Sequence, residues 1–349
     1  MQLDNLSLIS NRDPENALDV ILGSYKQLEF NAKIQQSKSS HNPIHNIVLS
    51  GMGGSCLAGL IANRWLRHDY TLNVPFEISR EYTVPEYVNN KTLSIIFSVS
   101  GNTEETLSSL DDAIAKHSQI VIITSGGKLL KRAQDDQLPY IKLDKISQPR
   151  YGVFMHLRAI TQIFESYGIV KGAYQELADS AEFVKNYANK LAAVVPFERN
   201  GAKQLADSCM GKTVLVFASS WFYPLAYKWK TSFNENAKNI IWCNEFPEFN
   251  HNEFIGWTKQ PIEKPFAVIS LRSNLDSTRV NQRFDLSEKL LSGMRPHSHD
   301  IWLEGDTYLK QTLSGAIMAD CSSIYLAINN NIDPTPVKLV EKLKQLLAS

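Results

Sequence analysis

Short apolar segments alternate with longer amphipathic segments along the first half of the chain. The apolar segments are too short for helices and predict buried strands at residues 47–49, 76–78, 93–97 and 120–123. Between them, apolar side chains recur at helical spacing, as in the segments that begin at Leu57 and Leu107. Ahead of the first strand, Asp13-Pro14 predicts the start of a helix that carries Leu18, Ile21, Leu22, Tyr25 and Leu28.

The second half of the chain shows the same alternation of short apolar segments and longer amphipathic segments. Its predicted strands lie at residues 213–218, 240–243, 265–271 and 300–303. Helical spacing predicts helices at residues 224–238, 284–291, 317–328 and from about 335 onward. A helix near residues 154–164 and the polar stretch 167–175 mark the predicted junction. We therefore expect two α/β domains, residues 1–170 and 171–349, each with a mainly parallel sheet between layers of helices.

Composition narrows the class of protein without identifying it. Hydrophobic residues make up 43% of the 349 residues and charged residues 21%, as in ordinary soluble proteins. Lys plus Arg and Asp plus Glu both number 36, so no net charge attracts nucleic acid or an anionic membrane. The four cysteines lack the spacing of a zinc site or disulfide framework. The first residues lack the pattern of a secretory signal. We expect a cytoplasmic protein that binds neither nucleic acid nor membrane.

The turn after the first predicted strand has the features of an anion site. Residues 50–55 read Ser-Gly-Met-Gly-Gly-Ser. In an open parallel sheet, such a turn lies at the carboxyl end of a strand, where the N-terminus of a helix attracts negative charge. Gly53 and Gly54 let the backbone approach a ligand closely, and Ser55 adds a hydroxyl group. The glycine spacing matches neither the dinucleotide-binding motif nor the P-loop, which weakens those two interpretations.

A second turn has similar chemistry. Residues 98–106 read Ser-Val-Ser-Gly-Asn-Thr-Glu-Glu-Thr, and Ser98, Ser100 and Thr103 supply hydroxyl groups between a predicted strand and a predicted helix. A third strand end, Thr-Ser-Gly-Gly at residues 124–127, is similar in character. Any one such turn also occurs as a plain connection. Two of them after separate strands favour a combined site for a phosphorylated polar ligand, held without a cluster of Arg or Lys.

These turns resemble those of the sugar isomerase (SIS) domain. Asn-Glu-Asn-Ala-Lys at residues 234–238 and Pro-Glu-Phe-Asn-His-Asn-Glu at residues 247–253 resemble the bifunctional phosphoglucose/phosphomannose isomerase family. So does the tail Asn-Ile-Asp-Pro-Thr-Pro-Val at residues 331–337. The resemblance extends from about residue 47 to residue 347. It implies two SIS domains, each a flavodoxin-like three-layer sandwich, in a homodimer whose active sites are shared between subunits.

The resemblance also implies roles for single residues. Glu235 would be the general base that moves a proton between C1 and C2 of the open-chain sugar, and Arg150 would stabilise the cis-enediolate. His251, donated by the partner subunit, and Lys344 would open the sugar ring. No metal or other cofactor is implied. The substrate phosphate would be bound by Gly53, Gly54, Ser55, Ser98, Ser100 and Thr103.

The chemistry of isomerisation needs residues of these types. A partly desolvated carboxylate makes an effective base because its pKa rises towards neutrality. A well-placed guanidinium stabilises the enediolate by about 3 kcal/mol, and histidine titrates near neutral pH. Outside the matched motifs, Glu235 and Arg150 would by default be surface residues. Lys344 would by default belong to a solvated, charged helix face.

Substrate breadth follows from the planar intermediate. A cis-enediol erases the stereocentre at C2, so a site that admits both epimers would convert glucose 6-phosphate and mannose 6-phosphate to fructose 6-phosphate. The resemblance implies that a small side chain near the last helix provides the room, and Thr335 and Val337 are the candidates. Two alternatives stay open: a non-catalytic regulator that binds a sugar phosphate, and an isomerase or lyase that acts on another phosphosugar.

Overall fold

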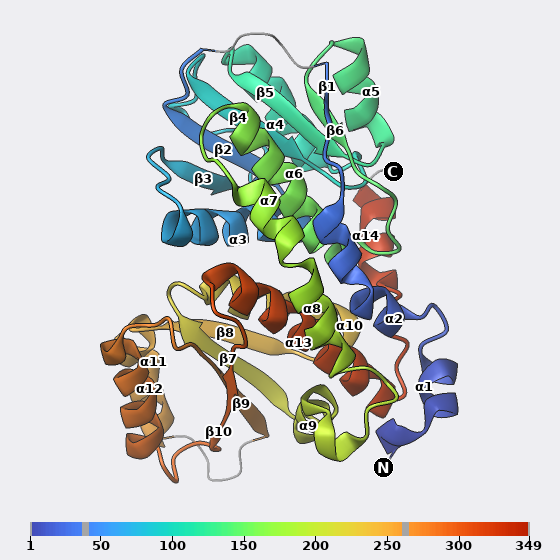
Figure 1. The fold of residues 1–349 in the computed structure, drawn as a ribbon, viewed down its shortest axis with the longest axis vertical. Helices are drawn as coiled ribbons and strands as arrows, with labels where there is room; N and C mark the ends of the chain where they lie inside the picture. Colours follow the sequence, from blue (N-terminus) through green and yellow to red (C-terminus); the bar gives the residue numbers. More distant parts are fainter. Residues whose placement is uncertain (1, 37–41, 260–264, 348–349) are drawn as a thin grey trace. The chain divides into compact units, whose positions relative to one another are not determined.

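The computed structural model describes residues 2–36, 42–259 and 265–347, with the backbone alone at 344 and 345. The chain forms two compact units. One consists of residues 24–182, and the other combines residues 1–23 with residues 183–349. Each unit has its own sheet and its own helices (Figure 1).

The unit of residues 24–182 is built on a six-stranded sheet in the order β1-β6-β5-β4-β2-β3. All pairings are parallel except that of β1 with β6. β1 and β6 are the two strands that the apolar pattern did not predict. The strands are β1 (Ile34–Gln35), β2 (Asn46–Gly51), β3 (Phe76–Ser79), β4 (Thr92–Phe97), β5 (Gln119–Thr124) and β6 (Tyr140–Lys142).

Helices cover both faces of this sheet. On one face, Val48 and Ile96 pack with side chains of α4 and α5, such as Leu110 and Leu129. On the other face, Leu49 lies against Gly59 of α3, since neighbouring strand residues point to opposite faces. The helices of this unit are η2 (Ser24–Glu29), α3 (Gly53–Asp69), α4 (Glu104–Ala115), α5 (Gly127–Asp135), η3 (Pro149–Tyr151), α6 (Val153–Ser166) and α7 (Ala173–Asp179).

The second unit has a four-stranded parallel sheet in the order β10-β9-β7-β8. Phe217, Phe246 and Val268 on one face pack against Phe284 of α12. Both sheets confirm the predicted fold class, and each of the eight predicted strands is present within a few residues. The strands of this unit are β7 (Thr213–Ser219), β8 (Ile241–Phe246), β9 (Phe266–Arg272) and β10 (Ser298–Trp302).

The central helix of this unit is α13 (Tyr308–Asn329), which is buried along nearly its whole length. A helix that is apolar on all sides needs neighbours on all sides, and α13 packs on α2, α9 and α10. The remaining helices are η1 (Gln2–Asp4), α1 (Leu6–Arg12), α2 (Ala17–Leu22), α8 (Ala181–Asn189), η4 (Phe197–Arg199), α9 (Gly201–Ser208), α10 (Tyr223–Asn236), η5 (Glu248–His251), α11 (Glu253–Gly256), η6 (Trp257–Lys259), α12 (Thr278–Leu290) and α14 (Lys338–Leu347).

The N-terminal segment packs with the C-terminal half of the chain, so the units differ from the expected division at residue 170. Leu18 and Ile21 of α2 are buried, and Arg12 donates a hydrogen bond to the carbonyl of Ile328. The helix predicted from Asp13 was placed wrongly. It starts at Ala17, because the Asp13 carboxylate accepts the amides of Ala17 and Leu18, and a 3-10 turn replaces its second half.

None of the helices in the described part of the chain combines the length and the apolar character that a bilayer crossing needs.

Candidate active site

The first predicted phosphate turn forms the start of α3. The cap residue Met52 makes no side-chain hydrogen bond to the helix, and Ser55 donates its backbone N–H to the Met52 carbonyl at 3.2 Å. Gly53 and Gly54 carry the first amides of the helix, which no intrahelical carbonyl can accept. Gly53 has φ of +52°, a conformation that glycine adopts readily. The turn therefore presents backbone N–H groups at the positive end of a 17-residue helix.

The hydroxyl groups of the second turn are held in a network. Ser98 Oγ shares hydrogen bonds with Thr103 Oγ1 at 2.8 Å and with Ser100 Oγ at 3.5 Å. It also accepts the backbone N–H of Gly101 at 3.1 Å. Thr103 occupies the cap position of α4, yet it makes no side-chain cap hydrogen bond to that helix. The hydroxyl groups of Ser98, Ser100 and Thr103 thus lie within 3.5 Å of one another through Ser98.

The two turns follow neighbouring strands. β2 and β4 are parallel neighbours with Gly51 opposite Phe97, so the residues that follow each strand emerge side by side. A Cβ added to Gly51 would lie 2.7 Å from the Phe97 carbonyl oxygen, so a side chain at this position would push the turns apart. The structure brings Gly53, Gly54 and Ser55 to the same sheet edge as the serines of the second turn.

The third turn supports the second rather than forming a separate site. Lys128 donates its backbone N–H to Asn102 Oδ1 at 3.0 Å, and Leu129 donates to the Gly101 carbonyl at 2.9 Å. A Cβ on Gly101 would nearly coincide with the carbonyl oxygen of Gly126, at 1.8 Å. These backbone contacts use the first amides of α5, which would otherwise be available to an anion.

Arg150 lies beside the first turn. A Cβ on Gly54 would be 3.2 Å from the Pro149 carbonyl oxygen and 3.6 Å from the Arg150 Cα. Arg150 is 4% exposed. Its guanidinium stacks on the ring of Tyr151 at 4.7 Å and donates to Gln148 Oε1 at 3.1 Å. The structure therefore places Arg150 beside the first of the two predicted phosphate turns, and both turns lie in the same unit.

In the second unit, Glu235 lies in the last turn of α10, and its neighbours anchor that turn. Asn236 donates to Ser323 Oγ at 2.9 Å in a buried contact with α13. Lys238, at φ of +50°, donates its Nζ to the carbonyl oxygens of Asp333 and Pro334 at 2.9 and 3.0 Å. Asn236 and Lys238 thus anchor the backbone that directly follows the half-exposed Glu235.

The chain before the last helix meets the same end of α10. Thr335 is 1% exposed and donates its N–H to Asp333 Oδ1 at 3.0 Å, while Val337 is half-buried. Of the two residues considered for substrate breadth, Thr335 thus directly follows the segment that Lys238 anchors beside Glu235. Lys344 belongs to α14, and its side chain lies outside the described atoms.

His251 lies at the other end of β8 from Glu235. Glu235 is in the helix before the start of this strand, whereas His251 is exposed in η5, after its end. A strand of six residues spans about 20 Å. The structure of one chain therefore does not bring these two predicted catalytic residues together.

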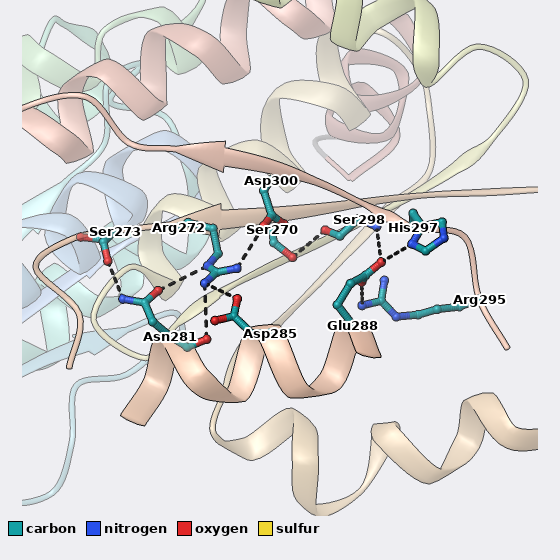
Figure 2. Close-up of polar contacts among 10 residues, drawn as sticks. All are labelled: Ser270, Arg272, Ser273, Asn281, Asp285, Glu288, Arg295, His297, Ser298 and Asp300. Carbon is teal, nitrogen blue, oxygen red and sulfur yellow. Dashed lines mark hydrogen bonds and ion pairs between the residues drawn. The ribbon is translucent and has the colours of Figure 1, made fainter. Parts of the chain in front are cut away.

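A polar pocket of about 450 Å³ lies between α12 and the edge of the second sheet. Arg272 lines this pocket, with Nη2 2.8 Å from Asp285 and Nη1 3.0 Å from Asp300. Figure 2 shows both contacts. Glu288 binds both Arg295 and His297 at 2.8 Å. Burial raises the pKa of Asp300. Because carboxylates already neutralise the buried Arg272, this pocket is a poor site for a phosphate.

Cys56 and His156 are two further buried polar residues of the unit of residues 24–182. Cys56 is buried and accepts a hydrogen bond from Arg80 Nε at 2.8 Å, and burial raises the pKa of its thiol, as expected of a packing residue.

His156 was not predicted from sequence. It is fully buried beside Phe97 and Gly152, and its only signal is a histidine within an apolar helix. Across the described ranges, no three or more His, Cys, Asp or Glu side chains gather as metal ligands.

Comparisons with known proteins agree with this architecture. The SIS domain family matches residues 42–156, and the bacterial phospho-glucose isomerase C-terminal SIS domain family matches residues 198–347. A glucose-6-phosphate isomerase-like protein from Thermus thermophilus has the same fold, with a TM-score of 0.66 at 16% identity over 98% of both chains. The class that the fold and these family matches define is a protein with two SIS domains.

Curated relatives narrow this class to a family. The bifunctional phosphoglucose/phosphomannose isomerase of Aquifex aeolicus (strain VF5) is 31% identical over 95% of this chain and 98% of its own length. The protein of the same name from Caldicellulosiruptor bescii is 32% identical over 87% of this chain and 90% of its own. The chain belongs to the bifunctional phosphoglucose/phosphomannose isomerase family.

Proposed function

We propose that this protein is an isomerase that interconverts glucose 6-phosphate and mannose 6-phosphate with fructose 6-phosphate. The observation that carries the proposal is the match, over 95% of the chain, to a relative named for both activities. We place the enzyme in the cytoplasm as a homodimer that binds neither nucleic acid nor membrane and needs no metal.

The substrate phosphate binds at the two turns of the first unit. The amides of Gly53 and Gly54 and the hydroxyl groups of Ser55, Ser98, Ser100 and Thr103 are its donors. Support comes from the pairing of β2 with β4, which brings the starts of both turns to one sheet edge, and from the Ser98–Thr103 hydrogen bond at 2.8 Å. Donors fixed before binding lose little entropy when the ligand arrives.

Glu235 removes the proton from C2 of the aldose and returns it to C1. Isomerisation through a cis-enediolate needs one base that reaches both C1 and C2. The backbone that carries this carboxylate must therefore be held in a fixed position. The anchors at Asn236 and Lys238 supply that rigidity. Arg150, a buried guanidinium beside the phosphate turn, stabilises the negative charge that develops on the enediolate oxygens.

His251 of the partner subunit and Lys344 open the sugar ring. The separation of Glu235 and His251 along β8 supports a site shared between two copies of the chain. Thr335, which follows the segment anchored by Lys238, leaves room for either configuration at C2, and both aldoses then reach the same planar intermediate.

The test is a coupled assay of both aldose phosphates with one chelator-treated preparation of wild-type protein and of Glu235→Gln. We expect turnover of both sugars by the wild-type protein. The variant should still bind fructose 6-phosphate but isomerise it at least ~100-fold more slowly, because it lacks the general base. Glu198→Gln, which changes an exposed carboxylate of the same unit, is the matched control and should retain wild-type turnover.

Each negative result has a distinct meaning. Near-wild-type turnover by Glu235→Gln would exclude Glu235 as the base. Absence of turnover by the wild-type protein, with fructose 6-phosphate still bound, would favour the non-catalytic regulator. Turnover of only one of the two aldose phosphates would exclude dual specificity, while the proposal that the protein is an isomerase would stand.

A further inference from the structure

The guanidinium of Arg150 is held by two neighbours in the same short segment of chain. Arg150 donates from Nη2 to the hydroxyl oxygen of Tyr151 at 3.3 Å and from Nη1 to Gln148 Oε1 at 3.1 Å. Its central carbon lies over the Tyr151 ring, 4.7 Å from the ring centroid. A ring beneath a planar guanidinium holds its plane, and acceptors at both terminal nitrogens oppose its rotation within that plane. The two neighbours therefore fix the orientation of the group.

The backbone of this segment is braced by a residue far away in the sequence. Gln27 of η2, 124 positions before Tyr151, donates its Nε2 to the Tyr151 carbonyl oxygen at 2.8 Å. The Oε1 of Gln27 accepts the backbone N–H of Met155 at 3.3 Å. One side-chain amide thus joins η3 to the first turn of α6. Within the turn, Tyr151 donates its N–H to the Gln148 carbonyl at 3.0 Å.

Burial strengthens the contact between Arg150 and Tyr151. The two residues are 4% and 2% exposed. A hydrogen bond that involves an ionised donor is stronger where water is excluded than at the surface. Phenylalanine could supply the same ring at position 151, but it could not accept this hydrogen bond. The hydroxyl group of Tyr151 therefore adds an orienting contact to the packing that the ring provides.

We propose that Tyr151 and Gln148 are positioning residues for the isomerisation, which hold the Arg150 guanidinium in the orientation that stabilises the enediolate. The inference rests on the role proposed above for Arg150. Stabilisation of developing charge depends on donors that are aligned before the charge appears, and a displacement of about 1 Å can slow a reaction by about 100-fold. Tyr151 and Gln148 act through Arg150, transfer no proton and are not catalytic residues.

The test begins with kcat and KM for fructose 6-phosphate in Tyr151→Phe and Gln148→Leu. Each variant removes one acceptor from the guanidinium and leaves Arg150 in place. Each should lower kcat by about five- to tenfold, the effect of one hydrogen bond to a charged group. KM should change by less than about threefold, because the proposed phosphate donors lie on other turns. Tyr151→Leu, which also removes the ring, should lower kcat further than Tyr151→Phe does.

A double-mutant cycle separates positioning from a general structural effect. Arg150→Met alone should lower kcat by at least about 100-fold, because it removes the stabilising cation. Combined with Arg150→Met, Tyr151→Phe should lower kcat no further, since the hydroxyl group has no guanidinium left to hold. If Arg150→Met does not fold, Arg150→Lys takes its place, because an ammonium group lacks the planar fork. Gln148 is half-buried, so Gln148→Leu serves in the cycle if the Tyr151 variants do not fold.

Tyr140→Phe is the matched control. Tyr140 lies in the same unit, is 5% exposed and donates its hydroxyl group to Gln35 Oε1 at 2.6 Å. The variant loses the hydrogen bond of a buried phenol, as Tyr151→Phe does, but this bond joins β6 to β1 and does not involve Arg150. It should retain the wild-type kcat.

The outcomes distinguish the inference from its premise. Wild-type kcat in Tyr151→Phe and Gln148→Leu, with Arg150→Met impaired, would overturn the positioning role alone. Equal losses from Tyr151→Phe with and without Arg150→Met would also overturn it, because the hydroxyl group would then act independently of the guanidinium. Wild-type kcat in Arg150→Met would refute the role proposed for Arg150 itself, and the positioning role would fall with it.

Discussion

At the scale of single residues, His156 gives the protein a measurable response to acid. Its pKa falls from 6.5 to about 3 on folding, chiefly because burial disfavours the charged ring. The unfolded chain takes up a proton below pH 6.5, while the folded protein does not. The stability of the folded state is therefore complete above pH 6.5 and is lost progressively as pH falls towards 3.

We predict that His156→Gln reduces this loss. Between pH 7.5 and pH 5, the wild-type protein should lose roughly 2 kcal/mol more free energy of unfolding than the variant, from one proton bound only by the unfolded chain. Urea unfolding at the two pH values measures the difference. His45→Gln, at an exposed position, should behave as the wild-type protein does. Equal pH dependence in wild-type protein and His156→Gln would contradict a buried neutral imidazole.

At the scale of elements, a polar contact fixes α10 on α13. Lys228 Nζ lies 2.5 Å from Asp320 Oδ1, and Ser232 donates to the same oxygen at 2.6 Å. Asn236 bonds Ser323 one turn further along. Lys228 and Asp320 are almost completely buried. Polar pairs at fixed intervals specify the register of two helices more sharply than apolar contacts do, and here that register sets the position of Glu235.

We predict that Asp320→Ala destabilises the protein by about 3–5 kcal/mol, because it leaves the Lys228 ammonium buried without its carboxylate. The double variant Lys228→Met/Asp320→Leu should regain most of that loss, while kcat stays below the wild-type value because the register is less well fixed. Urea unfolding and the isomerase assay measure the two effects. Glu304→Ala, which breaks the exposed pair with Lys190, should cost less than about 1 kcal/mol. Full recovery of kcat in the double variant would show that packing alone positions α10.

At the scale of the whole molecule, the separation of Glu235 from His251 predicts complementation between chains. Glu235→Gln and His251→Ala should each be nearly inactive alone. In a refolded equimolar mixture, half of the dimers contain one copy of each variant, and one of their two sites has both residues intact. Activity should therefore return to about a quarter of the wild-type value in a symmetric dimer.

Refolding each variant separately before mixing provides the control, since no exchange of subunits then occurs at the start. A mixture that stays inactive after refolding would mean that a single chain completes its own site.

The sequence was sufficient for the fold because the strands are apolar and the helices are periodic. All six residues of β4 are buried, as its mostly apolar sequence predicts. β1 and β6, with two and three residues, are too short to show a pattern. The helix expected from Asp13 failed because a carboxylate can cap from several positions, and the sequence does not show that Asn16 adopts a left-handed conformation.

The sequence predicts candidate residues that belong to recognisable motifs. It does not reveal residues whose burial depends on the packing of distant segments. The hydroxyl groups of the two turns are visible as serines and threonines in a row. Lys228 and His156 look like ordinary polar residues within helices, and only the packing of distant segments buries them. A burial that depends on contacts such as that of Lys228 with Asp320, 92 positions away, cannot be deduced from local spacing.

The discontinuity of the second unit has a consequence for the order in which the protein is made. Leu18 and Ile21 belong to the helix that packs on α13, and α13 ends at Asn329. A ribosome that adds about 5–20 residues per second makes this partner on the order of tens of seconds after the first helix emerges. During that interval the unit of residues 24–182 becomes complete in sequence, whereas the apolar face of α2 still lacks its native partner α13. The nascent chain therefore exposes an early segment whose protection depends on its last third.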